Sequence, residues 1–199
     1  MLGSITPLGE RGRGQRWGIT VTANVIGSVV AGASFGGLVG LVGGWVLDLL
    51  RPPNHVLLAA LAVAIIAAAA ADLVLRRDRI PGPRRQVDET WLTRYRGWVY
   101  GLAFGAQLGV GVATVVSTAA VYGTFLAAFL SGSSVGGAAI GAVFGLARAA
   151  TLLLVRRVRT MDRVLAVDAR LRAWEASARR SALVSMAALA LATFAITTV

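Results

Sequence analysis

Long stretches without any charged side chain are the feature that most constrains this chain. No charge occurs from Trp17 to Leu47, and none from Gly97 to Leu130. Only 15% of the 199 residues are charged, whereas soluble domains carry about 25%. Apolar stretches of this length, with charges gathered between them, are typical of helices that cross a lipid bilayer. Because small and apolar residues follow one another without the alternation of strands, we expect an all-α fold.

The apolar stretches define about five expected membrane spans. In chain order they cover residues 17–47, 55–75, 97–130, 135–155 and 181–199. We expect residues 1–16 to form a cytoplasmic N-terminal tail and residues 17–199 to form a single helix-bundle domain. The polar stretch 157–178 has an amphipathic pattern, which indicates a helix lying on the inner leaflet. Docking of a soluble cytoplasmic partner is the alternative for that stretch.

The arginines set the expected orientation in the membrane. The chain has 20 basic residues, all of them arginine, and most lie before residue 17, between residues 76 and 96, or between residues 156 and 180. The positive-inside rule places such stretches on the cytoplasmic side, which requires a cytoplasmic N-terminus. A net charge of +11 could also indicate nucleic-acid binding. Because the arginines adjoin apolar spans, we expect no nucleic-acid partner. The use of arginine alone as the basic residue, together with abundant Ala and Gly, suggests a bacterial protein of the inner membrane.

The sequence lacks the residue sets that carry most catalytic chemistry. It has no cysteine and one histidine, which excludes disulfides, thiolate metal sites and thiol redox relays. No metal-ligand spacing, phosphate-binding loop or nucleophile–base pair appears. We therefore expect neither an enzyme nor a bound cofactor or metal.

Two segments are longer than a single span requires. Residues 17–47 and 97–130 would each form a straight helix about 45–50 Å long, against a bilayer core of about 30 Å. Each is followed by a short turn, a span of ordinary length and an arginine cluster. This pattern predicts two tandem repeats of a long and a short helix, followed by a C-terminal span. Tilt, extension beyond the bilayer, or a break in mid-membrane would each accommodate the excess length.

Small residues recur at four-residue steps in three of the expected spans. This spacing keeps them on one helix face, where they let neighbouring backbones approach closely. The pattern, a glycine zipper, predicts helix packing at Gly32, Gly36, Gly40, Gly44, Gly101, Gly105, Gly109, Gly137, Gly141 and Gly145. Tight packing alone, a sliding surface for conformational change, and a homodimer face are the three interpretations.

Polar residues inside the spans are the candidate solute-binding residues. They are Asn24, Ser28, Gln107, Thr114, Ser117 and Arg148. An arginine near the bilayer centre costs about 2.5–3.5 kcal/mol, so Arg148 is expected to face the bundle or a wet cavity. Asp72 is its expected partner. The alternative is that Arg148 extends toward the lipid headgroups and Asp72 pairs with Arg76.

Part of the second half resembles a known family. The residues Gly101-Leu102-Ala103-Phe104-Gly105 and Val143-Phe144-Gly145-Leu146-Ala147 resemble the CcdA/DsbD-type membrane domains of the LysE-like transporter group. That resemblance implies about six helices in two inverted repeats, and either transfer of reducing equivalents through a cysteine pair or export of small solutes. This chain has Val110-Gly111 where the family has Pro-Cys, so the redox residues do not carry over. The arginine pattern also indicates parallel repeats, not inverted ones.

Two functions fit these features. The first is a small-solute permease or exporter that works by alternating access, with Arg148 suited to an anionic solute. The second is a non-transporting membrane subunit or scaffold that binds other membrane helices or a cytoplasmic partner. In both functions the protein contacts the lipid bilayer as a partner, and it can associate with a second copy of itself or with another membrane subunit.

Overall fold

The fold is a bundle of helices in which one long helix serves as the common packing surface. The computed structural model describes residues 5–74, 90–111, 119–156 and 160, together with scattered residues between 165 and 188. The helices of the bundle are α1 (Pro7–Gly12), α2 (Trp17–Leu50), α3 (Asn54–Val74), α4 (Trp91–Arg94), α5 (Gly97–Val110), α6 (Ala120–Leu130) and α7 (Ser134–Ala150), with the 3₁₀ helix η2 at Thr151–Val155. These ranges contain no strand, which confirms the expected all-α class.

The helices have the length and composition of a membrane protein. Three of them, Trp17–Leu50, Asn54–Asp72 and Ser134–Val155, are long and apolar enough to cross a bilayer, and Ala120–Leu130 is a shorter apolar helix. Large apolar side chains are exposed on their outer faces, among them Ile26, Val30 and Leu38 of α2. This is the arrangement that a helix bundle needs in lipid, where apolar surface is favourable on the outside. Most of the span expected at 181–199 and most of the stretch 157–178 lie outside the described residues.

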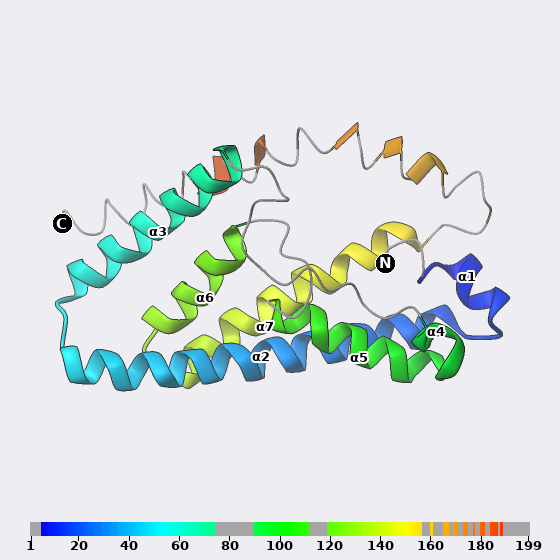
Figure 1. Ribbon diagram of the computed structural model, residues 1–199, viewed down its shortest axis with the longest axis horizontal. Helices are drawn as coiled ribbons and strands as arrows, with labels where there is room; N and C mark the ends of the chain where they lie inside the picture. Colours follow the sequence, from blue (N-terminus) through cyan, green and yellow to red (C-terminus); the bar gives the residue numbers. More distant parts are fainter. Residues whose placement is uncertain are drawn as a thin grey trace.

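Helix α2 is unbroken along its whole length. Its 34 residues correspond to about 51 Å, longer than a bilayer core. It ends at Arg51, which adopts a left-handed conformation (φ 46°) ahead of Pro52 and Pro53. From this turn α3 leans away from α2, and α6 lies between the two (Figure 1).

The segment 97–130 is divided into two helices. Helix α5 ends at Gly111, where φ is +73°, and α6 begins at Ala120. The two segments aligned by the predicted repeat therefore differ, since 17–50 is continuous and 97–130 is interrupted. Of the three ways to accommodate the excess length of 97–130, the structure shows a break.

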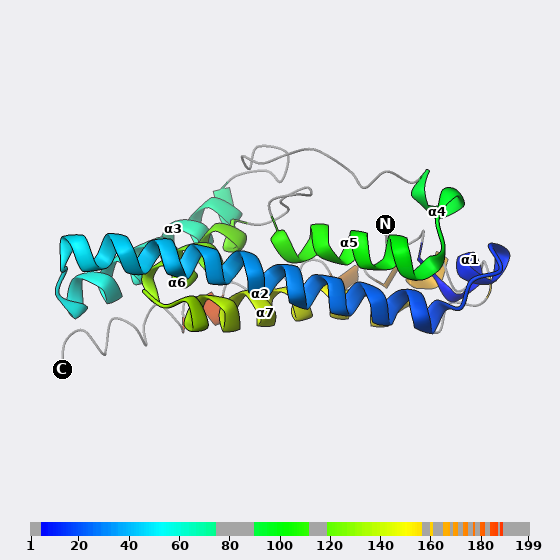
Figure 2. The ribbon, with the colours of Figure 1, turned by 90° about the horizontal axis from the view of Figure 1, so that it is seen from below.

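Helix α2 lies beside both α5 and α7 (Figure 2). Glycines at these contacts bring the backbones close together. A Cβ added at Gly32 would collide with the carbonyl oxygen of Gly141, and one at Gly36 with that of Gly137. The reverse holds too, since a Cβ at Gly141 or Gly137 would meet the carbonyl oxygen of Gly32 or Gly36. As the residue numbers of the contacting glycines rise along α2, those of their partners in α7 fall, so the two helices are antiparallel.

The α2–α5 contact has the same character but the opposite sense. Added Cβ atoms at Gly101, Gly105 and Gly109 would collide with the carbonyl oxygens of Thr20, Asn24 and Ser28. The numbers rise together, so α5 runs parallel to α2, as the first helices of two parallel repeats would. Glycine is needed at these positions because any side chain would force the backbones apart.

A pair of alanine substitutions in α2 tests this packing. Gly36→Ala places a methyl group against the α7 backbone, and we expect it to lower the free energy of unfolding in detergent by about 1–3 kcal/mol. Gly18→Ala is the control, because an added Cβ there meets nothing within 4 Å. Its alanine should leave stability unchanged or raise it by up to about 1 kcal/mol through helix propensity. Equal stability of the two variants would show that the close contact is not required.

Candidate functional site

The interruption between α5 and α6 lies at mid-height of the bundle. An added Cβ at Gly109, in the last turn of α5, would lie 2.9 Å from the backbone nitrogen of Gly32. Gly32 is close to the midpoint of α2, which runs from Trp17 to Leu50. If α2 crosses the bilayer, the backbone of the 97–130 segment leaves its helical path near the membrane centre.

Gly111 and an aromatic cluster form the α5 side of the interruption. The positive φ of Gly111 is a conformation that glycine adopts without strain. An added Cβ there would also lie 2.8 Å from the Phe144 ring and 3.0 Å from the Phe125 ring. Phe125 packs edge-on against Phe35 (5.1 Å between centroids) and lies 5.8 Å from Phe144. Rings from α2, α6 and α7 thus meet where α5 stops.

Asp72 caps the far side of the interruption. Its carboxylate accepts a hydrogen bond of 2.7 Å from the backbone N–H of Ala119, the residue that precedes α6. The first N–H groups of a helix lack partners within the helix, and the helix dipole favours a negative charge there. This contact gives a reason for a carboxylate within a predicted span. Pairing of Asp72 with Arg148 stays a prediction, and Arg76 lies outside the described residues.

Two of the predicted site residues flank the same interruption. Arg148 is half-buried in the last turn of α7, and its guanidinium lies over the Phe144 ring at 5.5 Å from the centroid. A cation over an aromatic face is attracted by the ring quadrupole, which helps to hold a charge away from water. Gln107 is half-buried on α5, one turn before Gly111. Together with Asp72, these side chains come from three different helices.

Asn24 and Ser28 lie in helix–helix contacts. Both are fully buried on α2. The Asn24 amide donates to the carbonyl oxygen of Gly101 (3.2 Å), and the Ser28 hydroxyl donates to that of Gly145 (2.8 Å). These hydrogen bonds join α2 to α5 and to α7. Thr114 and Ser117 lie outside the described residues.

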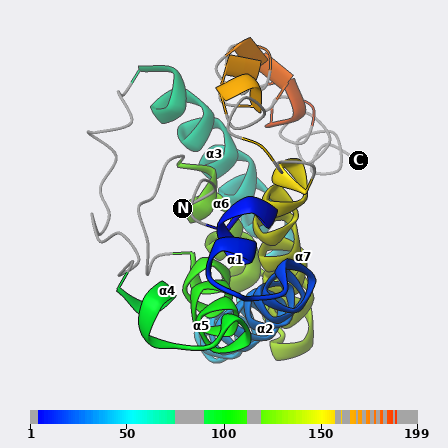
Figure 3. The same cartoon turned by 90° about the vertical axis from the view of Figure 1, so that its right-hand side faces the viewer.

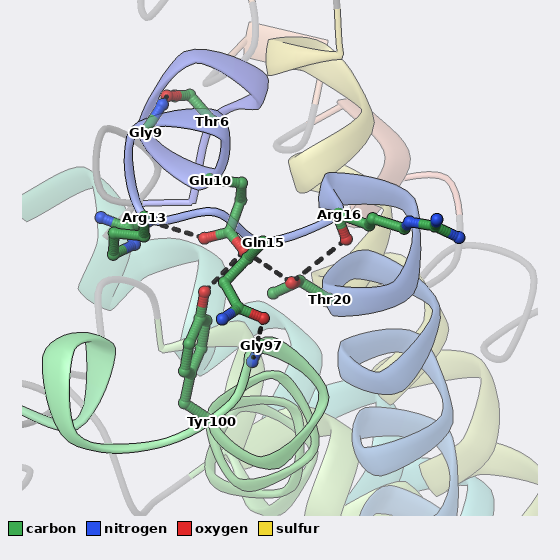
Figure 4. Close-up of polar contacts among 9 residues, drawn as sticks. All are labelled: Thr6, Gly9, Glu10, Arg13, Gln15, Arg16, Thr20, Gly97 and Tyr100. Atoms are coloured by element: carbon green, nitrogen blue, oxygen red, sulfur yellow. Dashed lines mark hydrogen bonds and ion pairs between the residues drawn. The ribbon is translucent and has the colours of Figure 1, made fainter.

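A buried polar cluster that was not predicted from the sequence lies where α2 and α5 begin (Figures 3 and 4). Figure 3 shows α1 lying over the end of the bundle where α2 and α5 begin. The Glu10 carboxylate, fully buried, accepts hydrogen bonds from the hydroxyls of Thr20 (2.6 Å) and Tyr100 (2.5 Å) and pairs with Arg13 (2.6 Å). Burial alone would lower the pKa of Arg13. Its hydrogen bond and attraction to Glu10, with help from Tyr100, outweigh this and raise that pKa, so Arg13 stays charged.

Part of this cluster left a signal in the sequence. Thr6 followed by Pro7 is a common helix start, and the Thr6 hydroxyl does accept the N–H of Gly9 (3.0 Å). Helix α1 could therefore have been predicted inside the segment 1–16. The burial of Glu10 could not, because it depends on Tyr100, 90 residues away along the chain.

Neither a metal site among the described residues nor a similar known protein points to a function. Within the described ranges no three His, Asp or Glu side chains gather in a way that could hold a metal ion. Comparison with protein-family models, curated proteins and solved structures finds no match. The resemblance to the CcdA/DsbD-type domains stays a prediction.

Substitutions at Asp72 test whether it caps α6. Asp72→Ala removes the acceptor for the Ala119 N–H and should lower the free energy of unfolding by about 1–2 kcal/mol. Asp72→Asn keeps an acceptor oxygen and should lose less than half as much. Asp48→Ala, at an exposed carboxylate of α2, is the control and should have little effect. Identical losses in the alanine and asparagine variants would argue against a capping role.

Proposed function

We propose that this membrane protein is a permease for small solutes, with its solute site at the interruption between α5 and α6. The observation that carries the proposal is the break in the 97–130 segment opposite the middle of α2. Broken helices at mid-membrane are a recurrent feature of transporter binding sites, because helix ends and unwound backbone offer polar groups to a solute. A protein that served only to hold other helices would not need such a break.

The side chains at the interruption favour a small anion as the solute. Arg148 supplies a positive charge and Gln107 supplies both a donor and an acceptor. The start of α6 adds the positive end of a helix dipole, which Asp72 partly compensates. In this proposal Gln107 and Arg148 contact the solute, Asp72 positions α6, and Asn24 and Ser28 hold the helices together.

The helices differ in how closely they pack against their neighbours, and this difference suggests which of them move during transport. Helices α2, α5 and α7 are held by direct backbone contact, whereas α3 has α6 as its principal neighbour among the described elements. We propose that α3 and the start of α6, which Asp72 links, move against the α2–α5–α7 unit, while the end of α6 stays in contact with α2 at Gly43. This motion would expose the interruption between α5 and α6 first to one side of the membrane and then to the other.

Flux measurements test the site. Purified protein in proteoliposomes is assayed with acetate, lactate, phosphate and sulfate, and at least one anion should show saturable uptake. Gln107→Ala and Arg148→Ala should each lower the initial rate about ten-fold, as expected for loss of a hydrogen bond to a charged solute. Arg156→Ala, at an exposed arginine beyond η2, is the matched control and should transport normally.

Two outcomes would contradict this proposal. Normal flux in both site variants would remove the assignment of Gln107 and Arg148. No saturable flux of any of the four anions would oppose an anion permease and favour the alternative of a non-transporting membrane subunit.

Labelling of introduced cysteines tests the proposed orientation, because the natural chain contains none. An impermeant maleimide should reach Pro83→Cys and Asp168→Cys from the cytoplasmic side of inner-membrane vesicles. It should reach Asn54→Cys, at the exposed start of α3, from the opposite side. Labelling of residue 83 or 168 from the outer side would overturn a cytoplasmic N-terminus as derived from the arginines.

A further inference from the structure

The residue Ile5, just before helix α1, attaches this part of the chain to the bundle by apolar contacts. Ile5, fully buried, packs in a cluster with Val21 of α2, Tyr100 and Phe104 of α5 and Leu152 of η2. A helix of six residues is too short to be stable alone, so α1 depends on this docking for its structure.

At its other side, α1 is attached through one carboxylate. Glu10 bonds to Thr20 of α2 and to Tyr100 of α5, so a single group joins α1 to the starts of both helices. Burying a carboxylate is costly unless its oxygens are hydrogen-bonded. Removing one donor therefore weakens the docked state by more than the loss of an ordinary surface contact.

The linker after α1 makes a second connection to α5. The Gln15 side-chain oxygen accepts the backbone N–H of Gly97, the first residue of α5 (3.0 Å). Helix α1 ends at Gly12 and the linker contains Gly14, and an added Cβ at either would meet nothing within 4 Å. Glycine also carries no side chain that would hinder a change of backbone conformation at these two positions.

We propose that α1 is a releasable strap: while Glu10 is bonded to Thr20 and Tyr100 it covers the starts of α2 and α5, and its release exposes those two ends. This inference goes beyond the proposed permease function and does not depend on it. A strap of this kind would control access to the buried side chains at the α1 end of the bundle.

The test uses single cysteines in the full-length, otherwise cysteine-free chain in detergent. Ile5→Cys reports on the strap and Val21→Cys, only 6% exposed in the bundle, reports on the end of α2. Tyr100→Phe keeps the ring and removes one hydroxyl, and Glu10→Ala removes the whole connection. We expect both changes to raise maleimide labelling of both reporters by about ten-fold or more, since the open state gains in population when a buried hydrogen bond to a charge is lost.

Controls separate strap release from unfolding. Tyr95→Phe, at an exposed tyrosine, should change neither labelling rate. Val121→Cys, buried on α6 away from α1, should stay protected in every variant. Unchanged protection of Ile5→Cys in both Tyr100→Phe and Glu10→Ala would overturn the proposal. So would exposure of Val121→Cys at the same rate as Ile5→Cys, because that would mean that α1 leaves only when the whole bundle unfolds.

Discussion

Direct backbone contact along α2 is the constraint on which the rest of the structure depends. In lipid, apolar side chains gain nothing by leaving their surroundings, so helices associate through close packing and interhelical hydrogen bonds. Here glycines place the backbones of α5 and α7 against that of α2, at the positions where added Cβ atoms would strike carbonyl oxygens. Because both α5 and α7 pack along the glycine face of α2, that helix has to be straight and unbroken. That explains why α2 is continuous although it exceeds the thickness of a bilayer core.

The same contacts account for the interruption of the 97–130 segment. Helix α5 occupies the first half of α2, from Thr20 to Gly32, whereas the second half faces other partners. There Gly36 meets Gly137 of α7, and Gly43 meets the carbonyl oxygen of Phe129 at the end of α6. A continuous α5 would compete with these elements for one glycine face. Helix α5 instead ends at Gly111, and α6 contacts the second half of α2 through Phe125, which packs on Phe35, and Phe129, which meets Gly43.

The sequence predicted much of this bundle because its strongest signals are local. Charge-free stretches gave the all-α membrane class, and four-residue spacing placed glycines such as Gly36 and Gly141 on helix faces. Which helix each face contacts is a tertiary property and left no local trace. Gly111 stood among 24 glycines with nothing to distinguish it, since its positive φ appears only in the folded chain. The burial of Glu10 likewise left no local trace, because its partner Tyr100 is remote in sequence.

Glycine contacts determine how close the helices lie, but they leave the register between helices undetermined. Because they recur every four residues, a slide of one turn along α2 would bring equivalent glycines and carbonyl oxygens together again. Polar side chains break this degeneracy, as single buried polar residues do in coiled coils. Thr20, Asn24 and Ser28 stand one turn apart on the same face of α2 and bond in turn to Glu10, to Gly101 of α5 and to Gly145 of α7. Among the residues that the structure describes, none gives the Asn24 side-chain oxygen a hydrogen bond, so this polar face is not fully satisfied in the observed register. Three buried polar groups thus select one arrangement of α1, α5 and α7 from those that the glycines alone would permit.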